Sequence, residues 1–373
     1  MLSIEMEIIA VIILAALTCS ISGAFIVLRN DYYCADTASR SSFLGIVIAF
    51  ALAGYIFPPL VMITGAAAAM AGTLPVKKIS DKLGTETENI SSVIAPAMLC
   101  AGIIPALNIT GKSDFDISSM YLGETAFTYF DRVRIFGTDI GSYAFYCILA
   151  AAVINITLVS VFYKRFKLDA IDRGYALSVK MNIKTLDLVL VIMTSLSVAV
   201  SFQTAGIFIT VSFLLGPAAI ARFYTKKLST MALVSAFVCL VSCLAGFGIA
   251  WSYEVSISGT ISVFIGIFFV VSVISAPEEG IAKKYMDKLT YRKRLEEFIV
   301  MNTILNNKVI KNPESEFYKD LAKTLNWKPL KASFILNKLQ AENKLAYTDG
   351  CFHLTDTGIA LTNEFLSELN CSR

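Results

Sequence analysis

Asp36 and Arg40 are the residues whose types and spacing point most directly to chemistry in this sequence. They stand four residues apart, so on a helix their side chains share one face, where a carboxylate and a guanidinium form an ion pair. Arg40 cannot bind a cation itself, because a guanidinium has five donors and no lone pair. Asp36 can, which leaves two alternatives: a structural ion pair or gate, or direct metal contact by Asp36.

The other groups that could bind a metal near this pair are hydroxyls. Thr37 and Ser39 follow Asp36 closely, whereas the single histidine of the chain is His353, near the opposite end. A cation route here would depend on carboxylate, hydroxyl and carbonyl oxygens, which suit manganese or another hard ion better than zinc. Cys239 and Cys243 have helical spacing but nothing nearby to complete a ligand set, so we expect them to pack between helices.

The elements that position Asp36 and Arg40 are expected to be membrane helices. Of the 373 residues, 56% are hydrophobic and 16% charged, whereas about a quarter of a soluble domain is charged. A bilayer core needs about 20 apolar residues per helix, and eight or nine spans fit this sequence. The candidate segments are Met6–Leu28, Ala38–Phe57, Leu60–Leu74, Ile90–Leu107, Gly141–Phe162, Leu186–Ser201, Ala205–Phe223, Thr230–Trp251 and Gly259–Ser275. Leu60–Leu74 and Ala205–Phe223, which contains Gly216-Pro217, are the segments expected to be broken, tilted or buried among other helices.

Lysine and arginine residues set the orientation of these spans. They concentrate in residues 77–82, 164–184 and 222–227 and after Ala276, which the positive-inside rule assigns to the cytosol. The N-terminus and the loop Asn108–Ile140 then lie outside. That loop holds five acids against three bases, which is either a mildly negative mouth that attracts cations or an ordinary solvated loop.

Three stretches resemble the permease subunits of bacterial ABC importers for zinc, manganese and iron, over about residues 6–275. Ser201–Gly206 and Leu214–Arg222 are similar to the Ser-x-Gln-x-x-Gly and Pro-Ala-Ala-x-Ala-Arg pattern of that family. Asp172–Lys180 resembles the short helix that such permeases insert into their ATPase, with Lys180 where the family has Gly. Asp36–Arg40 resembles the family's Asp-Ala-x-Ser-His, with Arg40 in place of the metal-binding His.

The resemblance implies a role for particular residues. It implies a transport pathway or gate formed by Asp36, Ser39, Arg40, Gln203 and Pro217, with Asp36 as the metal contact, and ATPase coupling through Asp172, Ala176 and Lys180. If Arg40 neutralises Asp36, a partner permease could supply the ligands in a heterodimeric pore.

The resemblance also implies partners: an ABC ATPase, an extracytoplasmic solute-binding protein, and a second permease copy or a paralogue. The sequence has no Gly-x-x-x-x-Gly-Lys-Ser/Thr loop, so ATP would be bound and hydrolysed by the partner chain. We therefore expect a transporter subunit of the bacterial cytoplasmic membrane, without catalytic residues and with no cofactor bound by this chain. The divalent metal ion is its cargo.

Residues 277–373 form a second expected domain, after a transmembrane permease domain over residues 1–276. Helices are expected at 295–304, 317–325, 331–342 and 355–369, with a hairpin over 344–354 around Asp349-Gly350. This order predicts a winged helix, and Leu354-Thr355-x-x-Gly358 resembles the segment that leaves the wing in many bacterial regulators. The predicted fold is therefore an all-α polytopic membrane protein with a small cytosolic winged-helix (α+β) domain.

The function of this second domain is open at the level of sequence. Lys328, Lys331 and Lys338 could contact the phosphates of DNA, but 15 basic residues against 13 acidic ones is a weak balance for a DNA-binding domain. A docking or self-association module is the alternative. Cys351 and His353 share one strand face, which permits a metal sensor but is more typical of an exposed wing. A different function class also fits the whole chain: a membrane-tethered regulator, in which a degenerate permease signals through the winged helix.

Overall fold

The computed structural model describes residues 4–54, 57–110, 132–135, 138–171, 173–179, 181–225, 227–277, 280–306, 321, 323, 325, 327–348 and 351–371. They form two compact units, unit 1 over Met1–Gly280 and unit 2 over Ile281–Arg373.

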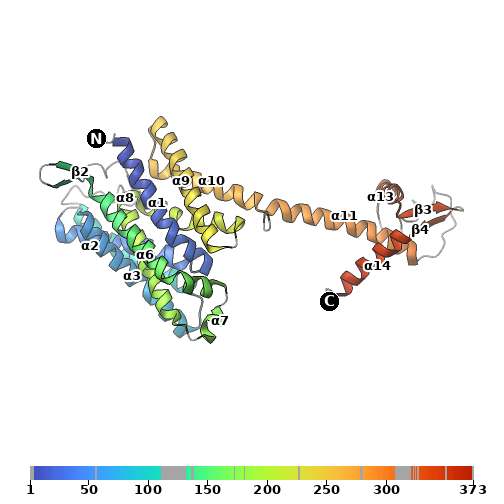
Figure 1. The fold of residues 1–373 in the computed structure, drawn as a ribbon, viewed down its shortest axis with the longest axis horizontal. Helices are drawn as coiled ribbons and strands as arrows, with labels where there is room; N and C mark the ends of the chain where they lie inside the picture. Colours follow the sequence, from blue (N-terminus) through green and yellow to red (C-terminus); the bar gives the residue numbers. More distant parts are fainter. Residues whose placement is uncertain are drawn as a thin grey trace. The chain divides into compact units, whose positions relative to one another are not determined.

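Unit 1 is a bundle of long apolar helices (Figure 1). Its elements are α1 (Ile4–Arg29), α2 (Tyr33–Ala53), α3 (Pro58–Leu83), α4 (Thr87–Thr110), β1 (Arg132–Ile135), β2 (Thr138–Ser142), α6 (Tyr143–Ile171), α7 (Arg173–Ser178), α8 (Ile183–Tyr224), α9 (Leu228–Tyr253) and α10 (Ile257–Ser275). Among the described residues, nine helical stretches are long and apolar enough to cross a membrane. Of the eight or nine spans expected, nine are thus confirmed, and most of them are longer than predicted.

Two details of the spans differ from the sequence prediction. The second span begins at Tyr33 instead of Ala38, so Asp36 and Arg40 both lie inside it. The break in α8 is at Gly206, with φ 82° and ψ 177°, and not at Gly216-Pro217. A positive φ is accessible to Gly because it has no Cβ, whereas Pro217 is buried inside a helical stretch that continues to Tyr224.

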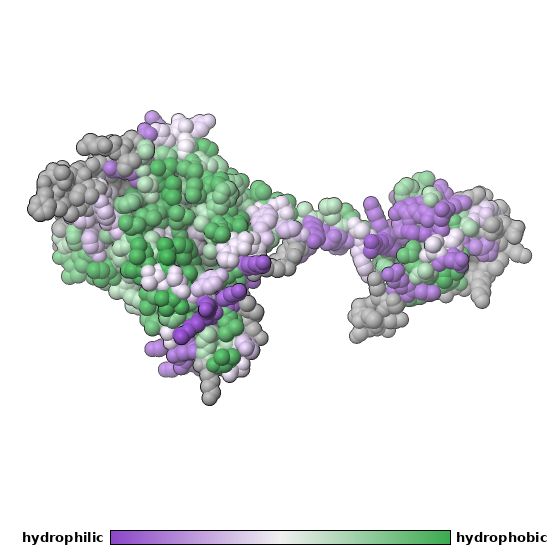
Figure 2. Space-filling view, in the orientation of Figure 1, coloured by the Kyte–Doolittle hydropathy of each residue, from purple (hydrophilic) through white to green (hydrophobic). Residues whose placement is uncertain are grey.

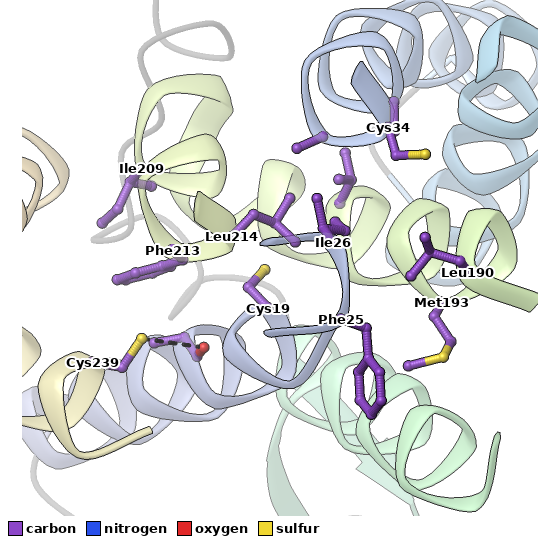
Figure 3. Packing of buried hydrophobic residues seen from close by; sticks show 14 of the residues in the cluster. Cys19, Phe25, Ile26, Cys34, Leu190, Met193, Ile209, Phe213, Leu214 and Cys239 are labelled. Carbon is purple, nitrogen blue, oxygen red and sulfur yellow. Dashed lines mark hydrogen bonds between the residues drawn. The ribbon is translucent and has the colours of Figure 1, made fainter. Parts of the chain in front are cut away.

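The core of unit 1 forms where α1 packs along α8, with α9 and α6 on its other sides. Cys19 of α1 is buried against Ser201 of α8, and the ring of Phe25 packs on Phe166 of α6 with centroids 4.9 Å apart. Cys239 of α9 donates to the carbonyl of Ala16 at 3.6 Å (Figure 3). A Cβ at Gly23 would overlap the carbonyl oxygen of Leu214. Gly23 therefore permits the close approach of α1 and α8, as small residues do in membrane bundles. Cys239 and Cys243 are both buried and free, as expected for packing residues.

Apolar residues also cover the outside of unit 1. Figure 2 shows its visible face as largely hydrophobic, and that of unit 2 as mostly hydrophilic. Leu52 and Leu233 are each 72% exposed and Phe237 is 68% exposed. Such exposure is expected of a surface that faces lipid, because acyl chains are as apolar as these side chains.

Unit 2 consists of α11 (Ile281–Asn306), α13 (Pro329–Ala341), the strands β3 (Leu345–Thr348) and β4 (Cys351–Leu354), and α14 (Asp356–Cys371). The strands pair antiparallel, from Leu345 opposite Leu354 to Thr348 opposite Cys351, so the expected hairpin is present. The helices expected at 295–304, 331–342 and 355–369 are confirmed. The one expected at 317–325 lies largely outside the described residues.

The core of unit 2 joins α11 and α13 to the hairpin. Val300, Leu336 and Leu339 are fully buried, and Phe352 of β4 is 7% exposed. A Cβ at Gly358 would overlap the carbonyl oxygen of Lys344, so the start of α14 lies directly against the start of the hairpin. This contact is the structural reason for a glycine four residues after Leu354.

Candidate functional site

Asp36 and Arg40 form the ion pair expected from their spacing. The Nε atom of Arg40 lies 2.8 Å from Oδ1 of Asp36, and the side chains of Arg40 and Asp36 are 39% and 41% exposed. The pair therefore lies on the surface of unit 1 and not in the core between α1 and α8. A charged pair on a membrane helix usually faces a polar route or a partner subunit, because a lipid-facing position is costly.

The hydroxyls beside Asp36 serve the packing of α2. Ser39 is buried and donates to the backbone carbonyl of Asp36 at 2.9 Å, within its own helix. Thr37 is buried and lies 2.7 Å from the hydroxyl of Ser91 on α4. These hydrogen bonds do not involve the carboxylate of Asp36. Among the residues that the structure describes, no three His, Cys, Asp or Glu side chains are grouped to hold a metal, and the Asp36 carboxylate is paired with Arg40.

The motif formed by Ser201–Gly206 and Leu214–Arg222 lies in α8, and its first part ends at the kink. Gln203 belongs to the helix just before Gly206, but its side chain lies outside the described residues. Ser201 is buried, and its hydroxyl lies 3.0 Å from the thiol of Cys19 on α1. Pro217, in the second helical stretch, is also buried. The motif therefore lies in the core of the bundle, and the structure does not bring Pro217 together with the Asp36–Arg40 pair in any hydrogen bond or ion pair of the described residues.

Arg222, the last residue of the stretch Leu214–Arg222, fixes the end of α8 to the turn between α1 and α2. Its Nη1 donates to the carbonyl of Val27 at 2.8 Å and to Oδ1 of Asn30 at 2.6 Å. The hydroxyl of Tyr32 accepts from the same nitrogen at 3.1 Å. Asn30 has φ 57°, in the left-handed region, so Arg222 stabilises a turn that brings the chain into α2.

The expected coupling segment forms the short helix α7 between α6 and α8. Ala176 is fully buried, and Tyr175 beside it is 56% exposed. The amide of Met181 donates to the carbonyl of Ala176 at 3.1 Å and closes the end of this helix. Asp172 and Lys180 lie outside the described residues. Thus α7 is held by Ala176 and presents Tyr175 to its surroundings.

A buried charge cluster, which sequence reasoning did not predict, lies where α1 and α6 end and α8 begins, beside Lys77 of α3. We call Arg29, Asp31, Lys77, Asp169 and Asp187 the Arg29 cluster. The Nε atom of Arg29 lies 3.2 Å from Asp31 and 3.1 Å from Asp169, and its Nη2 pairs with Asp187. Lys77 of α3 lies 2.5 Å from Asp187. The cluster therefore connects α1, α3, α6 and α8.

Burial makes the Arg29 cluster structurally important. The side chains of Arg29 and Asp169 are only 3% and 2% exposed, and buried charges are tolerated only when they are paired. Nη1 of Arg29 and Oδ1 of Asp169 are buried without a hydrogen-bond partner in the described part of the chain. In the structure Asp169 ends one span and Asp187 lies near the start of the next. The predicted span Gly141–Phe162 ended before Asp169, so no sequence signal indicated the cluster.

Two of the three lysines that could contact DNA form ion pairs within unit 2. Lys331 of α13 lies 2.6 Å from Glu296 of α11, and Lys338 lies 2.5 Å from Glu297. The hydrogen bond with Glu297 raises the pKa of Lys338 above its ordinary value. Lys328 is exposed at the start of α13. Two of the three candidate phosphate contacts are thus already paired with carboxylates.

Comparison with known proteins gives a consistent result. Residues 3–276 match the model of the ABC 3 transport family. The manganese transport system membrane protein MntD of Bacillus subtilis is 31% identical over 293 residues, covering 78% of this chain and 99% of that protein. The structure of PsaBC from Streptococcus pneumoniae in complex with Fab superposes with a TM-score of 0.64 at 19% identity, covering 76% of this chain and 95% of that one.

One similarity extends well into unit 2. The manganese transport system membrane protein MntC of Bacillus subtilis is 23% identical over 339 residues, covering 90% of this chain and 76% of that protein. Because 90% of 373 residues exceeds the 280 residues of unit 1, this match includes part of unit 2.

Proposed function

Since this chain belongs to the ABC 3 transport family and is a membrane permease subunit of a manganese or zinc ABC importer, we propose that its cargo is manganese. The observation that carries the choice of metal is the ligand chemistry. The single His of the chain is His353, in unit 2, so unit 1 has no imidazole and offers the carboxylate of Asp36 with backbone and hydroxyl oxygens. Oxygen ligands suit manganese, whereas zinc prefers nitrogen and sulfur. The relatives MntD and MntC are named as manganese transport proteins.

The pore is proposed to be shared with a second permease, a paralogue in place of an identical copy. Asp36 is a single ligand, and Arg40 already neutralises it at 2.8 Å, so the partner permease would supply the remaining ligands. In this proposal the Asp36–Arg40 pair is a gate, which opens when the metal competes with the guanidinium for the carboxylate. Ser39, Gln203 and Pro217 are proposed to belong to the same transport route. The competing version is that Asp36 binds the metal directly and Arg40 is displaced throughout.

An ABC importer also includes an ATPase and a binding protein, and α7 is the proposed contact with the ATPase. Asp172, Ala176 and Lys180 are the proposed coupling residues. The support is the position of α7 between two spans, with Ala176 buried and Tyr175 exposed. ATP is bound by the partner chain, no cofactor is assigned to this chain, and the divalent metal ion is the cargo.

The experiment for the gate is a set of charge variants in proteoliposomes that contain the chain, its ATPase and its partner permease. Manganese uptake is measured for the D36R/R40D swap, for R40H and for D81N, an exposed carboxylate on α3 that serves as the matched control. A gate formed by the pair predicts that the swap keeps transport and that R40H raises the affinity for the cation. Loss of transport in the swap, with D81N unaffected, would assign Asp36 as a direct ligand instead.

Unit 2 is proposed to be a winged helix that acts as a docking or self-association module. The support for the fold is the order α11, α13, hairpin, α14 and the close contact at Gly358. The support for the role is that Lys331 and Lys338 pair with Glu296 and Glu297, which leaves less positive charge for DNA. Nucleic-acid contact by Lys328, Lys331 and Lys338 stays a prediction.

One titration tests this role of unit 2. The binding of the full chain to duplex DNA is measured by fluorescence anisotropy at increasing salt. Affinity with the steep salt dependence of phosphate contacts, weakened by K328Q, would favour the membrane-tethered regulator over the docking module.

A further inference from the structure

The helix α11 has two parts with different surroundings. From residue 298 onward its apolar side chains enter the core of unit 2, where Phe298, Val300 and Met301 are 7%, 0% and 5% exposed. In contrast, every residue from 281 to 294 is exposed. We call this first part the basic segment of α11. The core of unit 2 therefore does not explain its composition.

The basic segment carries a strong positive charge. It holds six basic residues and one acidic residue, Asp287, a balance of +5. The basic residues are Lys283, Lys284, Lys288, Arg292, Lys293 and Arg294. Arg292 forms an exposed pair with Glu296 at 3.4 Å. Like charges crowded on one helix repel each other, so this composition favours a negatively charged partner.

The same segment also has an apolar face. With 3.6 residues per turn, Ile281, Tyr285, Met286 and Leu289 fall within an arc of about 140°. Their exposed fractions are 60%, 64%, 66% and 42%. Over residues 281–289 this arc is apolar and bordered by Lys283 and Lys288, whereas Arg292 and Lys293 fall within the same arc one turn further on. Long basic side chains can keep their charges in water while the apolar face is buried. The partner should therefore have a negative surface above an apolar interior.

The chain connectivity keeps the basic segment close to the membrane. The last span, α10, ends at Ser275, and α11 begins at Ile281, so the connection reaches at most ~20 Å. The positive-inside rule assigns this end of α10 to the cytosol, where the leaflet carries anionic lipids that attract basic segments next to a span.

We propose that the basic segment of α11 binds anionic phospholipid headgroups of the cytosolic leaflet and lies in the interface, with Ile281, Tyr285, Met286 and Leu289 toward the acyl chains. Helices with an apolar face and a basic polar face bind membranes in this way. The function goes beyond transport: the segment would set the distance between unit 2 and the membrane in response to lipid composition or to ionic strength.

The test uses the full chain in nanodiscs of phosphatidylcholine alone or of phosphatidylcholine with phosphatidylglycerol. The readout is hydrogen–deuterium exchange of the backbone amides in residues 281–294. Binding predicts slower exchange in the anionic nanodiscs, reversed by high salt. K284Q/K288Q removes two contacts and should weaken the protection roughly tenfold or more, since each basic residue near an anionic surface contributes several-fold. K284R/K288R keeps the charge and should keep the protection.

Two further variants distinguish lipid binding by this segment from a general effect of charge. K323Q/K328Q removes two exposed lysines elsewhere in unit 2 and should leave the protection unchanged. M286S/L289S keeps every charge and should reduce the protection, because the apolar face is lost.

Four results would overturn the proposal. They are equal exchange in the two nanodiscs, an equal effect of K323Q/K328Q and K284Q/K288Q, protection that arises only when the ATPase is added, and protection that arises only when DNA is added. The last two would assign the segment to a protein or to a nucleic acid instead.

Discussion

Replacing Arg29 with Met would remove the central cation of the Arg29 cluster. Arg29 is 3% exposed and contacts Asp31, Asp169 and Asp187, so in R29M Lys77 is the one described cation that remains beside three carboxylates. Removal of one partner from a buried ion pair costs about 3–5 kcal/mol, because the remaining charge stays buried and uncompensated. At 2–4 °C per kcal/mol for a chain of this size, the thermal midpoint of unit 1 should fall by roughly 6–20 °C.

The assay is thermal unfolding of the full chain in nanodiscs, with a matched control and a compensating variant. R165M removes an exposed arginine from α6, the helix that also carries Asp169, and should cost no more than about 0.5 kcal/mol. R29M/D169N should be less destabilised than the sum of R29M and D169N, with a coupling of about 1–3 kcal/mol. A midpoint for R29M equal to that of R165M, or additive effects in the double variant, would refute the reasoning.

The remaining predictions concern the kink, the hairpin and pH. G206A should destabilise unit 1 by about 1–2 kcal/mol, because the alanine Cβ is strained at φ 82°; the same thermal assay measures it. G358A should destabilise unit 2 by about 1–3 kcal/mol, because the new methyl group overlaps the carbonyl of Lys344; hydrogen–deuterium exchange of the hairpin amides measures it. The hydrogen bond from Lys344 lowers the pKa of Glu342, so this pair stabilises unit 2 above the ordinary glutamate pKa of about 4.3 and its contribution is lost as pH falls through the lowered value. The stability difference between the wild type and E342Q should therefore disappear in acid.

The sequence alone determined those features of the protein that depend on neighbouring residues. Continuous apolar runs predict spans because a helix must satisfy its own backbone in lipid, and nine such spans are present among the described residues. The Asp36–Arg40 pair follows from a spacing of four on one helix, and the hairpin from Asp349-Gly350 between two short strands. The family followed from the motifs around Asp36, Gln203 and Pro217.

Only the tertiary structure decided which distant residues meet. Arg29 and Asp187 are 158 positions apart, and no periodicity relates them; they pair because α1 packs along α8. Likewise Lys331 and Lys338 pair with Glu296 and Glu297 because α13 packs against α11. The structure also located the kink, since Gly206 has the unusual φ while Pro217 stays in a helix. Local patterns specify helices and their faces, but the pairing of faces depends on the packing of all helices together.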